Sequence, residues 1–189
     1  SAVEKDLDGT DAIVVGDYNK GVVTQELLEG LRALCRPRGI WLSLDPKPSH
    51  QLDISGLSLI TPNRGELFEL AGLTDETRHP NPLRDKNLMS AVKAVQAAYQ
   101  PALLLVTLSE HGMLLAQRGV KPVVIPTVAQ EVYDVSGAGD TVIASFTAAI
   151  AAGASPLEAT LFANHAAGVV VGKIGTATVT PKELAASFA

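Results

Sequence analysis

The stretch 134–141, Asp-Val-Ser-Gly-Ala-Gly-Asp-Thr, constrains the fold more than any other part of the chain. Residues 123–125 before it have the pattern of a strand. Residues 141–152 after it are apolar and rich in alanine, which predicts a helix closed by Gly153. The small residues between them allow several backbone N–H groups to point at one spot at a helix N-terminus, where an anion is favoured. Asp140 adds a carboxylate at the edge of this spot, as a base that deprotonates an attacking hydroxyl requires.

Other interpretations of these glycines are open or weaker. Asp140 also fits as a first-turn acid that complements the helix dipole, worth about 0.3–1 kcal/mol. A dinucleotide fingerprint needs a third glycine where Val142 stands. The run 168–174 has its glycines one residue too close for a phosphate-binding P-loop, and Ile174 replaces the Ser or Thr that would hold magnesium. We interpret that run as the end of an apolar helix.

Composition narrows the function classes. The chain has 189 residues, 47% apolar and 19% charged, which predicts one globular, soluble domain. Its net charge of -5 lacks the basic bias of proteins that bind nucleic acid or anionic membranes. No apolar run approaches the ~20 residues of a membrane span, and residues 1–11 lack the apolar core of a signal peptide. The single cysteine, Cys35, is expected in the core, and the protein is expected in the cytoplasm.

Strand and helix patterns alternate along the chain. Helix start signals follow Thr24, Asn63, Ser155 and Thr180, and a further helix is expected over residues 88–99. Pro37 and Gly39 are expected to end the first helix. The predicted strands are 12–15, 40–44, 57–60, 102–107 and a hairpin of 112–117 with 120–125. This order predicts an α/β fold with a mostly parallel sheet, helices on both faces, and ligands beyond the carboxyl ends of the strands.

Residues 134–140 resemble the signature of the ribokinase-like (PfkB) sugar kinases, and 126–143 are most similar to the heptose-7-phosphate kinases of lipopolysaccharide synthesis. Those enzymes form the kinase half of the bifunctional ADP-heptose synthase. The resemblance implies a ribokinase-like fold, with the amides of Gly137, Ala138 and Gly139 as an anion hole and Asp140 as the base. It implies ATP and Mg²⁺ as cofactors and a sugar phosphate, D-glycero-D-manno-heptose 7-phosphate, as the substrate.

Two further segments resemble the nucleotide-binding motifs of this family. In Asn63-Arg64-Gly65-Glu66, the asparagine would meet nucleotide phosphates, and Glu66 would orient a magnesium-bound water. The same spacing is also that of a helix capping box, and both roles are compatible. The segment with Thr107, Ser109, Glu110 and Gly112 resembles a nucleotide-contacting turn, and an ordinary hairpin entry is the alternative.

Asn164, on the helix that follows Pro156, corresponds by resemblance to an asparagine that borders the adenine. A buried asparagine whose amide is satisfied by the backbone is the alternative. The segment 172–179 also resembles the ending of the heptose kinases, and a loop there is expected to close over the nucleotide.

The substrate side of the resemblance rests on two short segments. Residues 16–21 resemble an Asp-Tyr-Gly-Lys-Gly segment, with Asn19 in the glycine position, where asparagine tolerates a left-handed backbone. Asp17 and Lys20 in this segment, and Lys47 in a segment that resembles Asp-Pro-Lys, are the candidate substrate-binding residues. Each lysine alone also fits a solvated surface position.

The family has a longer domain, with an early Gly-Gly substrate motif and a small β lid that this chain does not show. Residues 1–189 are therefore expected to be the C-terminal, nucleotide-binding part of a kinase domain, without its N-terminal part and lid. A truncated product, a proteolytic fragment or one piece of a two-chain assembly would each explain this. An exposed apolar sheet edge would favour a homodimer or a complementary N-terminal fragment as partner.

The leading hypothesis is an ATP-dependent kinase that phosphorylates the anomeric hydroxyl of heptose 7-phosphate. A non-catalytic nucleotide-binding fragment and a kinase of another sugar or nucleoside are the alternatives.

Overall fold

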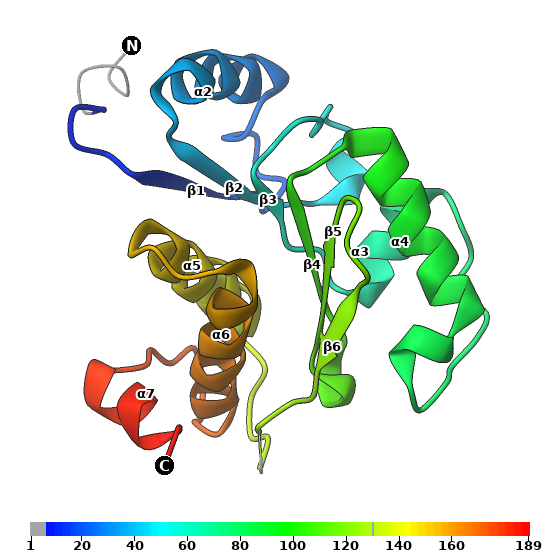
Figure 1. The fold of residues 1–189 in the computed structure, drawn as a ribbon, viewed down its shortest axis with the longest axis vertical. Helices are drawn as coiled ribbons and strands as arrows, with labels where there is room; N and C mark the ends of the chain where they lie inside the picture. Colours follow the sequence, from blue (N-terminus) through cyan, green and yellow to red (C-terminus); the bar gives the residue numbers. More distant parts are fainter. Residues whose placement is uncertain (1–6, 130) are drawn as a thin grey trace.

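The computed structural model describes residues 7–129 and 131–189 and forms a six-stranded sheet in chain order (Figure 1). The first four strands run parallel to one another. The fifth strand is antiparallel to the fourth and to the sixth, and the fifth and sixth form the predicted hairpin. The strands are β1 (Ala12–Gly16), β2 (Trp41–Asp45), β3 (Leu59–Ile60), β4 (Leu103–Thr107), β5 (Met113–Gln117) and β6 (Val123–Ile125). Residue 130, inside the 126–143 resemblance, and residues 1–6, inside the segment searched for a signal peptide, lie outside the described residues.

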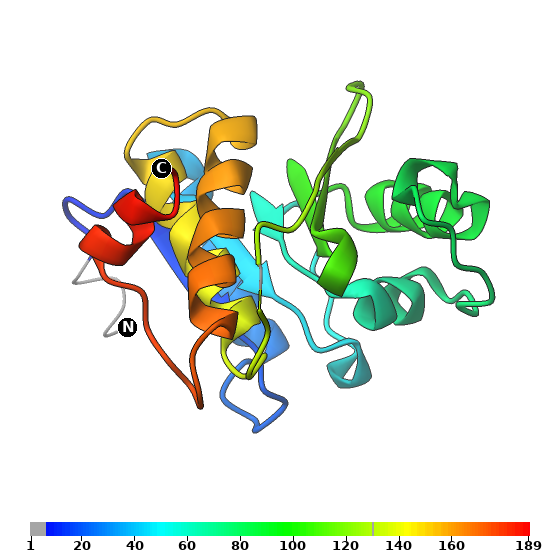
Figure 2. The ribbon, with the colours of Figure 1, turned by 90° about the horizontal axis from the view of Figure 1, so that it is seen from below.

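Helices cover both faces of this sheet, as predicted. On one face lie α2 (Gln25–Arg38), α3 (Arg64–Ala71) and α4 (Lys86–Tyr99), and on the other α5 (Ala138–Ala151) and α6 (Pro156–Val171). Figure 2 shows α5 and α6, in yellow and orange, on the opposite side of the strands from the green α4. The short α7 (Pro181–Ala186) packs on α6. Single 3-10 turns are η1 (Pro48–His50), η2 (Pro82–Arg84) and η3 (Ser109–His111).

Strand β4 shows why this sheet is apolar on both sides. Leu104 and Val106 belong to the core under α2, α3 and α4, whereas Leu103 and Leu105 belong to the core under α5 and α6. A strand buried on both faces has a continuous apolar sequence instead of an alternating one. Cys35 lies in the first of these cores, as expected, and is 2% exposed.

The predicted helix caps are confirmed, and two helix ends differ from the prediction. Ser155 and Thr180 each form a capping box, with Glu158 and Glu183 respectively. The first helix continues through Pro37 and ends at Gly39, whose φ of 68° is left-handed. Proline lacks only one backbone donor, and a glycine in the left-handed region gives a stronger stop signal.

Helix α5 begins at Ala138, three residues before the predicted start at Thr141. Gly137 precedes it with a φ of 79°, which only glycine adopts freely. The small residues that suggest a turn therefore form the first turn of the helix itself. As a result, Gly139 and Asp140 are placed directly at the N-terminal end of α5.

Strand β1 lies at one edge of the sheet, and Val14 on it is 43% exposed. This matches the expected apolar edge. In the part of the chain that the structure describes, no helix is both long and apolar enough to cross a membrane.

Candidate active site

The carboxyl ends of β1 and β2 meet the N-terminus of α5. The Tyr18 hydroxyl, just after β1, donates a hydrogen bond of 2.5 Å to Asp140 Oδ1 in the first turn of α5. Asp45, at the end of β2, approaches the same turn, because a Cβ at Gly139 would lie 3.8 Å from Asp45 Oδ2. Residues far apart in sequence thus surround one helix N-terminus, as parallel α/β folds predict.

Backbone donors are available at this N-terminus. The Ala138 N–H donates to the Val135 carbonyl at 3.2 Å. Among the described residues, the N–H groups of Gly139 and Asp140 have no such acceptor. The first N–H groups of a helix carry the positive end of its dipole, so these two are placed to hold an anion. Asp140 is exposed to solvent.

Asp45 carries the most perturbed carboxyl of the site. Burial, followed by the charge of Glu66, raises its pKa to about 6, while the Thr61 hydroxyl, 3.1 Å from Oδ1, and Lys47 oppose this shift. The Asp140 charge adds a smaller upward contribution. The charges of Glu66 on α3 and Asp140 on α5 therefore both act on the Asp45 carboxyl of β2. A nearby cation would oppose this upward shift of the Asp45 pKa, and perturbed carboxyl groups of this kind are typical of functional sites.

Glu66 is held from two sides. Its Oε1 accepts from the Lys47 ammonium, and this hydrogen bond raises the pKa of Lys47. Its Oε2 accepts the Asn63 N–H at 2.9 Å, and Asn63 Oδ1 accepts the Glu66 N–H at 3.0 Å. The capping box that the spacing allows is therefore present. Contacts of Asn63, Gly65 and Glu66 with a nucleotide or a magnesium-bound water stay predictions.

Asp17 is a buried carboxylate at the end of β1. Its Oδ1 accepts the Asn19 N–H at 2.8 Å, and its Oδ2 lies 2.9 Å from His50 Nδ1. Asn19 has a φ of 51°, so the expected left-handed turn is confirmed. Lys20 is exposed.

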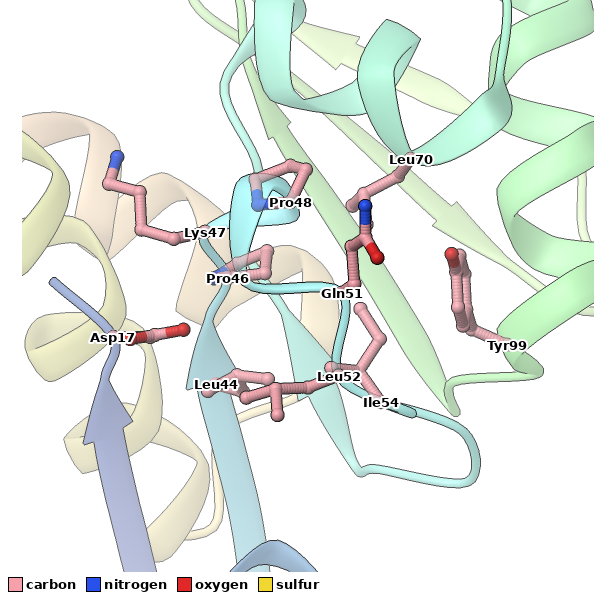
Figure 3. Close-up of a pocket in the computed structure, with 10 residues that line it drawn as sticks. All are labelled: Asp17, Leu44, Pro46, Lys47, Pro48, Gln51, Leu52, Ile54, Leu70 and Tyr99. Atoms are coloured by element: carbon pink, nitrogen blue, oxygen red, sulfur yellow. The ribbon is translucent and has the colours of Figure 1, made fainter. Parts of the chain in front are cut away.

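Asp17 and Lys47 also line a cavity between η1 and the neighbouring loops (Figure 3). Its volume is about 30 Å³, above the roughly 10–15 Å³ that a cavity needs to hold a water molecule.

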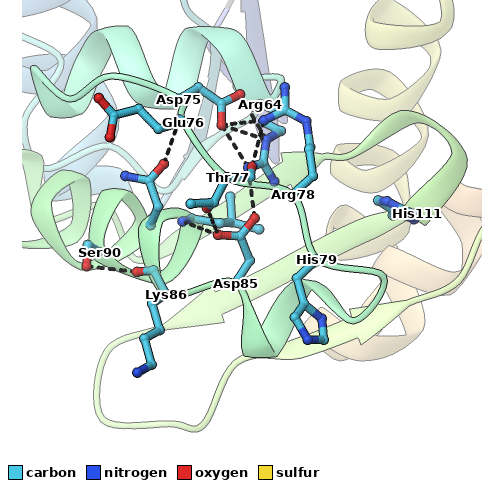
Figure 4. A network of polar contacts seen from close by, with 12 residues as sticks. Arg64, Asp75, Glu76, Thr77, Arg78, His79, Asp85, Lys86, Ser90 and His111 are labelled. Carbon is cyan, nitrogen blue, oxygen red and sulfur yellow. Dashed lines mark hydrogen bonds and ion pairs between the residues drawn. The ribbon is translucent and has the colours of Figure 1, made fainter.

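Arg64, a predicted nucleotide contact, is engaged elsewhere (Figure 4). Its Nη2 donates to Asp75 Oδ1 at 2.8 Å and to Asp85 Oδ2 at 2.9 Å, and its guanidinium lies 5.2 Å from the centre of the Phe68 ring. Asp85 also accepts from the Thr77 hydroxyl and caps α4. Arg64 therefore anchors the loop between α3 and α4. Because its guanidinium is bonded to Asp75 and Asp85, the structure does not support its predicted contact with a nucleotide.

The turn after β4 lies beside the Asn63 segment, because Thr107 and Asn63 form a parallel bridge. Gly112 has a φ of 80°, and a Cβ there would lie 2.0 Å from the Ile125 carbonyl oxygen, so only glycine fits. Ser109 and Glu110 are in η3, and both are exposed. Two of the predicted nucleotide motifs are thus adjacent, at the ends of neighbouring strands.

Asn164 is buried on α6 and donates from Nδ2 to the Pro126 carbonyl at 2.8 Å. This is the backbone-satisfied arrangement that the sequence left open. Its place near an adenine stays a prediction.

The segment 172–179 lies against the 134–141 signature, while its closure over a nucleotide stays a prediction. Asp134 Oδ2 accepts the Gly175 N–H at 3.1 Å, and a Cβ at Gly137 would lie 3.1 Å from Thr176 Cγ2. The C-terminal loop thus borders the N-terminus of α5.

Four polar residues of this edge were missed by the sequence reasoning: Tyr18, Asp45, His50 and Thr61. Tyr18 and Asp45 lie inside segments that resemble the heptose kinases, so that resemblance was the available signal. His50 and Thr61 gave none, because their partners are distant in sequence.

Comparisons with known proteins show the family of this chain. The family model described as "pfkB family carbohydrate kinase" matches residues 2–183. The chain is 43% identical over 185 residues to "Bifunctional protein HldE" of Sulfurimonas denitrificans and 44% identical over 179 residues to that of Sodalis glossinidius. These matches cover 97% and 94% of this chain but 37% and 35% of the relatives, so the chain spans little more than a third of their length.

Solved structures show the same fold. Arabidopsis thaliana ribokinase, complexed with ribose and ATP, superposes with a TM-score of 0.81 at 21% identity, covering 99% of this chain and 58% of that one. Escherichia coli phosphofructokinase-2 gives 0.80 at 19% identity, covering 99% and 60%. The predicted ribokinase-like α/β fold is therefore confirmed.

Proposed function

Because this chain belongs to the pfkB family of carbohydrate kinases, we propose that it is the nucleotide-binding part of an ATP-dependent heptose-7-phosphate kinase of ADP-heptose synthesis. The kinase class follows from the family. The choice of heptose 7-phosphate rests on relatives that are 41–44% identical and bear the name "Bifunctional protein HldE". The product would be the sugar phosphorylated at its anomeric hydroxyl.

Asp140 is the proposed base. In the transfer, the anomeric oxygen forms a bond to the γ-phosphorus of ATP, the bond from that phosphorus to ADP breaks, and the hydroxyl proton goes to the Asp140 carboxylate. The N–H groups of Gly139 and Asp140, which lack acceptors in the described chain, supply the electrostatic part of the anion hole. Gly137 and Ala138 shape the start of the helix that aims these donors.

The carboxyl groups of Asp45, Glu66 and Asp140 suit a magnesium ion bound nearby through its waters. Mg²⁺ prefers oxygen ligands and keeps several waters, and when bound it neutralises charge on the ATP phosphates. Burial and then the charge of Glu66 raise the pKa of Asp45, and a cation near these two residues would favour the ionised Asp45 carboxylate. No three described His, Cys, Asp or Glu side chains form a metal cage of their own. We therefore assign Glu66 and Asp45 to the waters of a metal held mainly by nucleotide phosphates.

The observation that carries the proposal is the place of Asp140, beside the free amides of α5 and within the signature that the family model matches. A non-catalytic nucleotide-binding fragment is the second candidate. It is favoured by the sugar side, because the candidate lysines there are Lys20, which is exposed, and Lys47, which is bonded to Glu66.

Asp140→Asn, measured in the full product of the gene, separates these candidates. We expect kcat for phosphoryl transfer to fall by about 10²–10⁴-fold, because the proton acceptor is lost. The Kd for ATP should change little, since the amides of α5 remain. Equal losses of turnover and ATP binding would contradict the assignment of Asp140 as base.

Glu26→Gln is the matched control, because Glu26 is also an acid in the first turn of a helix, α2, which covers the opposite face of the sheet from α5. If Asp140 only complements a helix dipole, the two variants should behave alike.

A further inference from the structure

The contact between Tyr18 and Asp140 joins the turn after β1 to the first turn of α5. The phenol oxygen lies 2.5 Å from Asp140 Oδ1, which is short for a hydrogen bond and typical of a donor on an ionised carboxylate. The two residues are 122 positions apart in sequence. Only the folded arrangement of β1 beside α5 brings them together.

Burial does not hold the phenol at this position. Tyr18 is 59% exposed, and Asp140 is exposed as well. The ring does lie over Gly16, where an added Cβ would stand 3.3 Å from Tyr18 Cε2. The glycine at the end of β1 thus leaves room for the ring beside the strand, which directs its hydroxyl towards α5.

In the part of the chain that the structure describes, the phenol is the only hydrogen-bond donor to the Asp140 side chain. An exposed carboxylate without a donor rotates freely about its side-chain bonds. With Oδ1 held by Tyr18, the rotation is restricted, and Oδ2 is the oxygen that has no hydrogen-bond partner among residues 7–129 and 131–189.

We propose that Tyr18 is a positioning residue for the base: its hydroxyl fixes Asp140 through Oδ1 and leaves Oδ2 to receive the proton of the acceptor hydroxyl. This inference rests on the proposed function, in which Asp140 is that base. Restricting the base to one productive orientation contributes to the rate through proximity and orientation, where small misplacements are costly.

The same contact perturbs the phenol. The hydrogen bond to Asp140, together with burial and the Asp140 charge, raises the pKa of Tyr18 to about 12. The hydroxyl therefore remains a donor across the working pH range. Exposed polar contacts of this kind add little to the free energy of unfolding, so loss of the hydroxyl should affect turnover far more than stability.

Tyr18→Phe keeps the ring beside Gly16 and removes only the hydroxyl. In the full product of the gene we expect kcat to fall by about 10–100-fold, with the KM for ATP within about twofold of the wild type and Tm nearly unchanged. Tyr133→Phe is the matched control, because the Tyr133 hydroxyl also donates to a carboxylate, Glu131, at 2.7 Å on an exposed surface. Unchanged or increased kcat in Tyr18→Phe would overturn the proposal, since the phenol would then be idle or would block the base.

A second measurement does not depend on turnover. NMR with tyrosine labelled at Cζ follows the Tyr18 phenol through a pH titration, with its signal assigned by its loss in Tyr18→Phe, while circular dichroism verifies that the protein stays folded. In Asp140→Asn, the pKa of Tyr18 should drop towards the ordinary value of about 10. An identical Tyr18 titration in the wild type and in Asp140→Asn would show that the contact is absent and overturn the inference. If the titration shifts but Asp140→Asn keeps full turnover, the proposed function fails instead.

Discussion

At the residue scale, the side chains of this edge mostly satisfy one another. Lys47 holds Glu66, Tyr18 holds Asp140, and Asp17 lies against His50. A ligand contact to Lys47 or Asp17 therefore requires a hydrogen bond within the protein to be exchanged, whereas the N–H groups of Gly139 and Asp140 are available without such an exchange. For Lys47, an anionic ligand would compete with the Glu66 carboxylate.

Asp45→Asn tests the electrostatics of this edge. The folded-state pKa of Asp45 is about 6, above the ~3.9 of an unfolded chain, so between these values the native state binds more protons. The contribution of Asp45 to stability is therefore most favourable below about pH 4 and declines as the pH rises to 6. A shift of about two units corresponds to about 3 kcal/mol above pH 6.

We expect Asp45→Asn to raise the free energy of unfolding at pH 7.5, by up to about 3 kcal/mol, and to have little effect near pH 4. Urea denaturation of both proteins at several pH values gives the difference. Asp53→Asn is the control, because hydrogen bonds from Ser55 lower the pKa of Asp53 and its contribution has the opposite sign. If the free energies of unfolding of Asp45→Asn and the wild type differ by a constant amount from pH 4 to 7.5, the raised pKa of Asp45 is ruled out.

The sequence was informative about residues only where the constraint is local. The left-handed Asn19 and the capping box of Asn63 with Glu66 follow from neighbours within a few positions, whereas the close approach at Gly112 involves Ile125 on another strand. The contacts of Tyr18 and Asp45 depend on β1, β2 and α5 lying side by side, which periodicity does not specify. Arg64 shows the same limit, because its partners lie in a loop whose path no short motif encodes.

At the element scale, strand and helix types were predictable because the apolar periods and caps agree with each other. The start of α5 was not. The small residues 137–139 fit both an irregular turn and the first turn of a helix. In the structure, Gly137 is the N-cap and the helix begins at Ala138. The difference matters, because it moves Gly139 and Asp140 from a loop onto a helix end.

The loop between α3 and α4 is held by Arg64, which is partly buried. Because Arg78 bonds the same carboxylate of Asp75, substituting each arginine in turn tests this role. Arg64 and Arg78 both bond Asp75 Oδ1, at 2.8 and 2.6 Å, but the Arg78 side chain is 63% exposed, whereas Arg64 is 16% exposed. Arg64→Ala leaves the carboxylate of Asp85, whose side chain is fully buried, without its cation, so we expect a loss of about 3–5 kcal/mol in the free energy of unfolding. Arg78→Ala should cost less than about 1 kcal/mol.

Urea denaturation at neutral pH measures both variants. The hydrogen bonds from Arg64 lower the pKa of Asp75, so the ionised carboxylate stabilises the fold above its unfolded pKa of about 3.9. The contribution is lost as the pH falls through the lower folded value. The gap between wild type and Arg64→Ala should therefore narrow as the pH falls below 4, and equal effects of the two arginines would contradict the anchoring role.

At the scale of the whole molecule, the described residues form the ribokinase-like sheet with β1 at its edge, and the relatives are longer than the matched region. The assignment of residues 1–189 to the nucleotide-binding part of a domain, a homodimer or complementary N-terminal fragment as partner, and a cytoplasmic location stay predictions. The structure supports the sugar site least, because neither candidate lysine is placed to bind a sugar phosphate: Lys20 is exposed, and Lys47 is bonded to Glu66.

The most direct test of the central claim is phosphorus NMR on the full product of the gene, with ATP, Mg²⁺ and D-glycero-D-manno-heptose 7-phosphate. We expect ADP together with a second phosphate ester on the sugar, whose signal couples to the anomeric proton. Both should disappear in Asp140→Asn. Binding of ATP without any new sugar phosphate would contradict the kinase proposal and favour the non-catalytic nucleotide-binding module.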